Sequence, residues 1–161
     1  MAEPAAMRLV GEKDVIAALD GMAKQSARNR VARPAIRAGA SIVSKAAKRN
    51  ASKANFTDSS GALKRSIGIK MFTGRRGVVA VIGARQGQGI RIHKGVKRNP
   101  FKYSHLVEKG TTHSVAKPFL EPAFEDNKAA IQREIRVKLR EGIIKEARRQ
   151  AKKAAARAAK R

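Results

Sequence analysis

The chain has 161 residues, of which 37 are Lys or Arg and 12 are Asp or Glu, giving a formal net charge of +25. This length fits one domain with an appendage, and the apolar content of 42% is enough for a core. The absence of cysteine excludes disulfides, thiolate metal sites and cysteine nucleophiles. No apolar run is long enough to span a bilayer, and we expect no secretory signal. So large a positive charge favours an acidic partner, nucleic acid first.

The first third of the chain predicts two helices. In residues 14–24, four apolar side chains recur at helical spacing: Val15, Ile16, Leu19 and Met22. In residues 33–53, a second apolar stripe has the same period and comprises Ile36, Ala40, Val43 and Ala47. Pro34 fits the first turn of this second helix, where its missing N–H costs nothing.

The middle of the chain predicts antiparallel strands. Residues 66–72 alternate apolar and other side chains, residues 73–77 have the composition of a turn, and residues 78–82 form a β-branched run. These three segments predict a β-hairpin. Residues 85–100 are rich in glycine and basic side chains, which indicates a loop or an extended arm. Residues 101–108 are predicted to form a third strand.

The last third predicts a turn bracketed by Pro118 and Pro122, followed by a long helix. Its apolar residues step mainly by four, at Leu120, Phe124, Ile131, Ile135, Leu139 and Ile143. After Ile144 all its apolar residues are alanine, so the surface has too little apolar area to dock on a core. We therefore expect the helix to run to about Lys160 with its last turns undocked.

Together these elements predict an α+β fold with two N-terminal helices, a small antiparallel sheet of about three to four strands, and a long C-terminal helix. Residues 1–145 are expected to form a single domain, and residues 146–161 a basic, Ala/Lys/Arg-rich helical extension. Eight basic side chains gather at this end, against the single acid Glu146: Lys145, Arg148, Arg149, Lys152, Lys153, Arg157, Lys160 and Arg161. Neutralising phosphates with such side chains releases counterions, which predicts salt-dependent, sequence-independent binding of nucleic acid.

The sequence shows no active site. Its histidines are His93, His105 and His113. His105 and Glu108 resemble a fragment of a metal-binding helix, but in the predicted strand their side chains would lie on opposite faces. No nucleophile elbow or P-loop pattern is present. We therefore predict a protein that is not an enzyme and needs no cofactor or metal.

Three short boxes occur in order along the chain. Residues 60–67 resemble a Thr-Gly-x-Leu-x-x-Ser-Ile pattern, carried here by Gly61, Leu63, Ser66 and Ile67. Residues 103–111 resemble Tyr-Ala-x-x-Val-Glu-x-Gly-Thr, carried by Tyr103, Val107, Glu108, Gly110 and Thr111. Residues 118–124 resemble Pro-Phe-Leu-x-Pro-Ala, carried by Pro118, Phe119, Leu120 and Pro122. In order and spacing, across roughly residues 12–145, the chain resembles the neck, or tail-completion, morphogenesis proteins of tailed bacteriophages.

This resemblance implies a structural virion protein of the neck and no catalysis. Such a protein would form a homo-oligomeric ring, on the order of six copies, completing the tail so that it can join a DNA-filled head. Its partners would be other neck and tail proteins and the DNA backbone in the channel, with no membrane; it would act in the virion after assembly in the host cytoplasm. Independently of the resemblance, Glu108 at the end of the predicted third strand is a candidate to pair with an arginine, within the chain or across a subunit interface, although a role in shaping the fold alone is favoured for it.

Some features leave alternatives open. Lys109 stands where an aromatic is common, and both the arm at residues 85–100 and the basic extension are long, so the sequence does not separate a tail-completion ring from a tail terminator ring. A ribosomal or other RNA-binding protein is the rival from a different class, because it would have this size and charge. A basic nuclease ranks last, since no metal-binding cluster of acids is evident.

Overall fold

The computed structural model describes residues 25–52, 61–74, 77–93 and 95–159. The helix predicted for residues 14–24 lies outside them. The elements, in chain order, are α2 (Gln25–Asn50), α3 (Ala62–Ser66), β1 (Ile67–Gly74), β2 (Gly77–Ala84), β3 (Arg91–His93), β4 (Val96–Arg98), α4 (Pro100–Lys109), α5 (Glu121–Glu125) and α6 (Lys128–Ala158). The predicted α+β class is confirmed.

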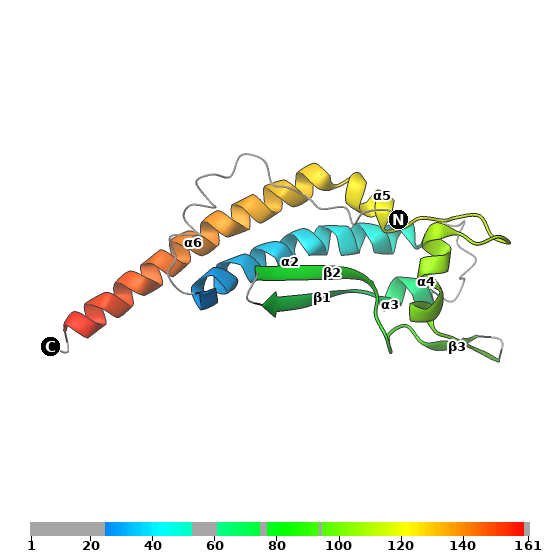
Figure 1. Ribbon diagram of the computed structural model, residues 1–161, viewed down its shortest axis with the longest axis horizontal. Helices are drawn as coiled ribbons and strands as arrows, with labels where there is room; N and C mark the ends of the chain where they lie inside the picture. Colours follow the sequence, from blue (N-terminus) through cyan, green and yellow to red (C-terminus); the bar gives the residue numbers. More distant parts are fainter. Residues whose placement is uncertain (1–24, 53–60, 75–76, 94, 160–161) are drawn as a thin grey trace.

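Helix α2 is the centre of the molecule, with the β1–β2 hairpin on one side and α6 on the other (Figure 1). The residues of α2 that face the core are mostly small, and a Cβ atom on Gly39 would lie 2.7 Å from the Ile135 side chain of α6. The prediction for the start of α2 is wrong: it begins at Gln25, so Pro34 lies inside the helix. Pro34 is exposed, and water can therefore reach the carbonyl group that its missing N–H leaves free.

The predicted hairpin is confirmed. Strands β1 and β2 pair antiparallel from Ile67 opposite Ala84 to Gly74 opposite Gly77. Along β1, the inner positions Ile67, Ile69 and Met71 are buried or half-buried, whereas Lys70 and Phe72 on the other face are exposed. The hairpin therefore packs one face on α2 and leaves the other to solvent.

Beyond the hairpin, the structure differs from the predicted sheet. The arm at residues 85–100 contains a short antiparallel ribbon in which β3 pairs with β4, separate from the hairpin. The described chain therefore has two two-stranded sheets where one sheet of about three to four strands was predicted.

The third strand predicted at residues 101–108 is wrong, because these residues form most of helix α4. Pro100 is its first residue and follows an extended Asn99, an arrangement that favours the start of a helix. The helix ends where the Gly110 N–H donates to the Leu106 carbonyl at 2.8 Å. Glycine at this position, like proline at the first, is a helix boundary signal.

The long C-terminal helix is confirmed, but it does not begin at the proline corner. A one-turn helix, α5, comes first, and α6 starts after a break at residues 126–127. Helix α6 buries Ile131, Ile135 and Leu139 in the core shared with α2. It runs to Ala158, close to the predicted end.

Candidate assembly surfaces and basic helix

The second and third boxes meet at one carboxylate. Glu108, near the end of α4, accepts hydrogen bonds from the backbone N–H groups of Phe119 at 3.0 Å, Leu120 at 3.1 Å and Glu121 at 2.8 Å. These donors belong to the start of α5, where N–H groups have no partner within the helix. A negative charge there also interacts favourably with the helix dipole. Within the described residues, these backbone groups take the place of the candidate arginine partner of Glu108.

Gly110 turns the chain so that this contact can form. Its φ is +76°, and a Cβ atom there would lie 2.8 Å from the Ala116 backbone nitrogen and 2.9 Å from the Ser114 oxygen. The Thr111 N–H then donates to the Ser114 carbonyl, and the Lys117 N–H to the Val107 carbonyl at 2.8 Å. Only glycine adopts this conformation in so tight a space without strain. The Gly-Thr part of the second box thus follows a helix, α4, and not the strand predicted for residues 101–108.

The first box packs into the same corner. Leu63, Ile67 and Phe119 are almost completely buried and belong to one core cluster. The Asn50 side-chain amide donates to the Phe119 carbonyl at 3.2 Å and ties the end of α2 to this corner. The remaining box residues form the margin of the corner: Gly61 precedes α3 with φ +63°, Ser66 is buried, Tyr103, Val107, Leu120 and Pro122 are half-buried, and Thr111 and Pro118 are exposed.

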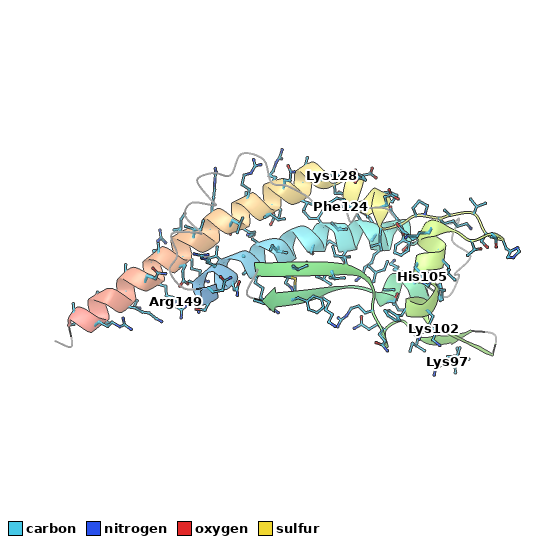
Figure 2. All side chains as sticks on the ribbon, in the orientation of Figure 1. Lys97, Lys102, His105, Phe124, Lys128 and Arg149 are labelled. Atoms are coloured by element: carbon cyan, nitrogen blue, oxygen red, sulfur yellow. The ribbon has the colours of Figure 1, made fainter. Side chains whose placement is uncertain are left out.

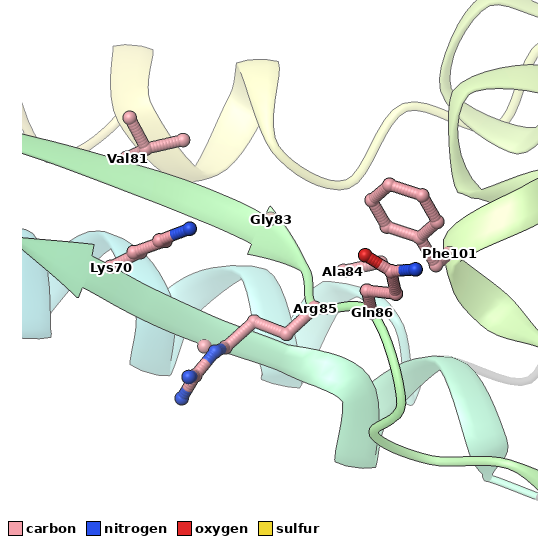
Figure 3. Close-up of a pocket in the computed structure, with 8 residues that line it drawn as sticks. Lys70, Val81, Gly83, Ala84, Arg85, Gln86 and Phe101 are labelled. Carbon is pink, nitrogen blue, oxygen red and sulfur yellow. The ribbon is translucent and has the colours of Figure 1, made fainter.

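The outer face of the hairpin carries exposed apolar side chains. Phe72 is 47% exposed, Val79 58% and Val81 52%. The predicted hairpin did not include this exposed apolar face, although the unbroken apolar run at residues 78–82 is the pattern of a strand covered on both faces. At one end of the face lies a hollow whose lining includes Lys70, Val81, Arg85 and Phe101 (Figure 3).

The basic extension begins where α6 leaves α2. Every side chain that the structure describes between residues 147 and 159 is exposed, and the protruding end of α6 is visible in Figures 1 and 2. Its described basic residues are Arg148, Arg149, Lys152, Lys153 and Arg157, with Lys145 one turn earlier; Lys160 and Arg161 lie outside the described residues. At 1.5 Å per residue, residues 147–158 extend about 18 Å.

Glu146 holds the last docked turn of α6. Its side chain is only 8% exposed and pairs with Arg30 Nε of α2 at 3.2 Å and with Arg149 Nη1 at 3.5 Å. Burial acts to raise the pKa of Glu146, but the charges of Arg30 and Arg149, with hydrogen bonds from Arg30 and Gln150, outweigh it and lower that pKa. The one acid of the basic end therefore remains ionised and joins the two long helices.

The described residues hold no cluster of three or more metal-ligating side chains. His105 and Glu108 do share one face of a helix, unlike in the predicted strand, but backbone N–H groups already bind the Glu108 oxygens. His105 and His113 are exposed. Within the same part of the chain, no helix combines the length and apolarity needed to cross a bilayer.

Comparisons with known proteins agree with the resemblance seen in the boxes. No curated protein and no solved structure matches the chain. A family model described as "Bacteriophage HK97-gp10, putative tail-component" matches residues 13–110, which is more than half of the chain. The match includes α2, the hairpin and α4 and ends before α5 and α6. The chain therefore belongs to the HK97-gp10-like family of bacteriophage tail components, and it is a structural protein of the phage tail.

Proposed function

We propose that this tail protein forms a ring at the neck, completes the tail and joins it to the DNA-filled head. Closed cyclic symmetry with on the order of six copies would match the tail axis. The predicted domain of residues 1–145, with the docked Glu146 added to it, would build the ring, and residues 147–161 would be a basic extension close to DNA. The family argues against the ribosomal alternative, because a tail component acts in the virion together with other tail proteins.

One observation supports the proposal most directly. Along α6, the part that packs against α2 is distinct from the part that carries basic side chains without acids. The docked part contains the acids Glu134, Glu141 and Glu146, whereas the sequence after Glu146 has none. The protruding turns thus present basic side chains in several directions around the helix axis. Such a helix repels its own copies in a ring unless an anion lies between them. The phosphates of DNA in the neck channel would supply that anion.

Two changes to α6 test the proposal by complementing a phage that lacks this gene. One variant ends at Glu146. The other keeps the full length but carries Gln in place of the five described basic residues from 148 to 157. Both should retain a folded domain and leave particles whose tails and heads fail to join. Plaque counts measure function, and mass spectrometry of gradient-purified particles gives the ratio of this protein to the major tail protein.

The outcomes separate the two parts of the proposal. Absence of the wild-type protein from tailed particles would rule out the neck role. Normal plaque counts with both variants would rule out a role for the basic extension and leave the ring. The full-length Gln variant is the matched control for the truncation, because it removes the charge and keeps the length of the helix.

A further inference from the structure

The outer face of the hairpin is a patch whose side chains are placed by the strand register. In the β1–β2 register, Phe72 lies opposite Val79 and Lys70 opposite Val81, so these four side chains form two adjacent cross-strand pairs. The Lys70 ammonium lies 4.9 Å from the centre of the Phe72 ring. Large apolar side chains gathered on one face indicate an interaction surface.

The charges around the patch restrict what can cover it. Arg85 lies beside it, since a Cβ atom on Gly68 would be 2.5 Å from the Arg85 side chain. Residues 61–107 contain no Asp or Glu at all. A second copy of the same face would therefore bring like charges together. A fitting occupant is apolar at its centre and carries acids at its margin.

Residues 12–22 have that composition. Their apolar residues at helical spacing, described above, are accompanied by Asp14 and Asp20, which a helical wheel places on opposite sides of the stripe. The other segment with acids and apolar residues is α5–α6, whose Ile131, Ile135 and Leu139 are already buried against α2. As a helix, residues 14–22 would be about 13 Å long, which matches about four residues of a strand.

The position of α2 indicates which copy supplies the segment. The Arg33 guanidinium of α2 donates to the Thr73 hydroxyl at 2.8 Å, close to the hairpin turn. The N-terminal end of α2 extends beyond that turn (Figure 1), and α2 lies on the face of the hairpin opposite the patch. Because the patch is exposed in the single chain, a neighbouring copy can cover it.

We propose that residues 12–22 of one copy dock as an amphipathic helix on the outer hairpin face of a neighbouring copy, with Phe72, Val79 and Val81 beneath the apolar stripe and Lys70 and Arg85 beside its acids. This inference rests on the proposed ring, for which it supplies a head-to-tail contact. A contact between two different surfaces can repeat around a ring until it closes.

Disulfide trapping tests this contact in the full-length protein, because the chain has no cysteine of its own. One preparation carries Leu19→Cys with an affinity tag, and a second carries Val79→Cys. Mixing and oxidising them should give a mixed dimer on a non-reducing gel. The yield should exceed by several-fold that of Leu19→Cys mixed with Val115→Cys, a control at a position that is 86% exposed and outside the patch. Adding Lys70→Glu to the Val79→Cys chain should lower the yield, whereas Lys64→Glu on α3 should not.

The results that would overturn this contact can be told apart from failure of the proposed ring. Equal yields with positions 79 and 115 would overturn the contact. So would a chain carrying both Leu19→Cys and Val79→Cys that closes on itself as a monomer, since the segment would then dock within one copy. Light scattering on the same samples reports ring formation separately. Rings without the position 19–79 link would refute the contact and leave the ring.

Discussion

The two halves of α6 are continuous in backbone but differ in their relation to the rest of the molecule. Residues 128–146 bury branched apolar side chains against α2 and end at the Glu146–Arg30 ion pair. Residues 147–158 offer only alanine as apolar surface, and their described side chains are exposed. Each alanine methyl would bury too little area to fix the helix on a core. Because extending an existing helix avoids a new nucleation step, the second half can stay helical without docking.

Among the changes that test this difference between the two halves, Leu139→Ala should have the largest effect on stability. Leu139 is 6% exposed in the docked half, and its truncation should lower the free energy of unfolding by about 2–5 kcal/mol. Ile144→Ala is the control on the same helix, because Ile144 is 54% exposed. Its cost should stay within about 0.5 kcal/mol. Urea unfolding measures both variants, and equal losses would contradict the assignment of the docked face.

Glu108→Gln tests the corner that positions the start of the docked half. The amide has one acceptor oxygen where the carboxylate has two, and it lacks the charge. Some of the three backbone donors at α5 should therefore lose a partner, at a cost of roughly 1–3 kcal/mol. Glu121→Gln is the control, since Glu121 contributes its backbone N–H and has an exposed side chain. An unchanged melting temperature for Glu108→Gln would show that the carboxylate does not hold this corner.

Glu146→Gln tests the last docked turn through pH. The folded-state pKa of Glu146 is lowered, so its stabilising contribution is present above the ordinary carboxyl value of 4.5 and is lost as pH falls through the folded pKa. The variant should melt at a lower temperature than wild type at pH 7. This difference should shrink as pH falls below about 4.5. A gap between the two melting curves that is constant from pH 7 to pH 3 would refute the ion-pair explanation.

The sequence could predict the elements whose apolar period is unambiguous. Alternation in residues 66–72 predicted the hairpin, and the four-residue steps predicted α6. Residues 101–108 were assigned to a strand because a short segment with few strong apolar residues does not separate the two periods. The helix boundary residues Pro100 and Gly110 were the signals that favoured α4.

The site was harder to predict because its contacts join distant parts of the chain. Glu108 bonds to backbone groups 11 to 13 residues away, and Arg30 to a carboxylate 116 residues away. No side-chain pattern encodes a backbone N–H as a partner, so an arginine was the candidate partner for Glu108. Within residues 78–82, the strand register decides which side chains face outward. By contrast, the exposure of the extension followed directly from its lack of any apolar side chain larger than alanine.

The smallest effect on stability, and the most specific for the protruding half, is expected from Lys152→Gln combined with Lys153→Gln. Both side chains are exposed and bear no packing role, so the free energy of unfolding should change by less than about 0.5 kcal/mol. Binding to duplex DNA should weaken, and the slope of log K against log salt should become shallower by roughly 2, at about 0.9 for each lost phosphate contact.

The matched control for this pair is Arg133→Gln with Arg140→Gln, which removes two exposed charges from the docked half of the same helix. Fluorescence anisotropy across a salt series measures both pairs. If both pairs reduced the slope equally, DNA would respond to net charge anywhere on α6, and the division of the helix would carry no functional meaning. If only the Lys152 and Lys153 pair reduces it, the same lack of apolar side chains that keeps the second half off the core also leaves its charges free for phosphate.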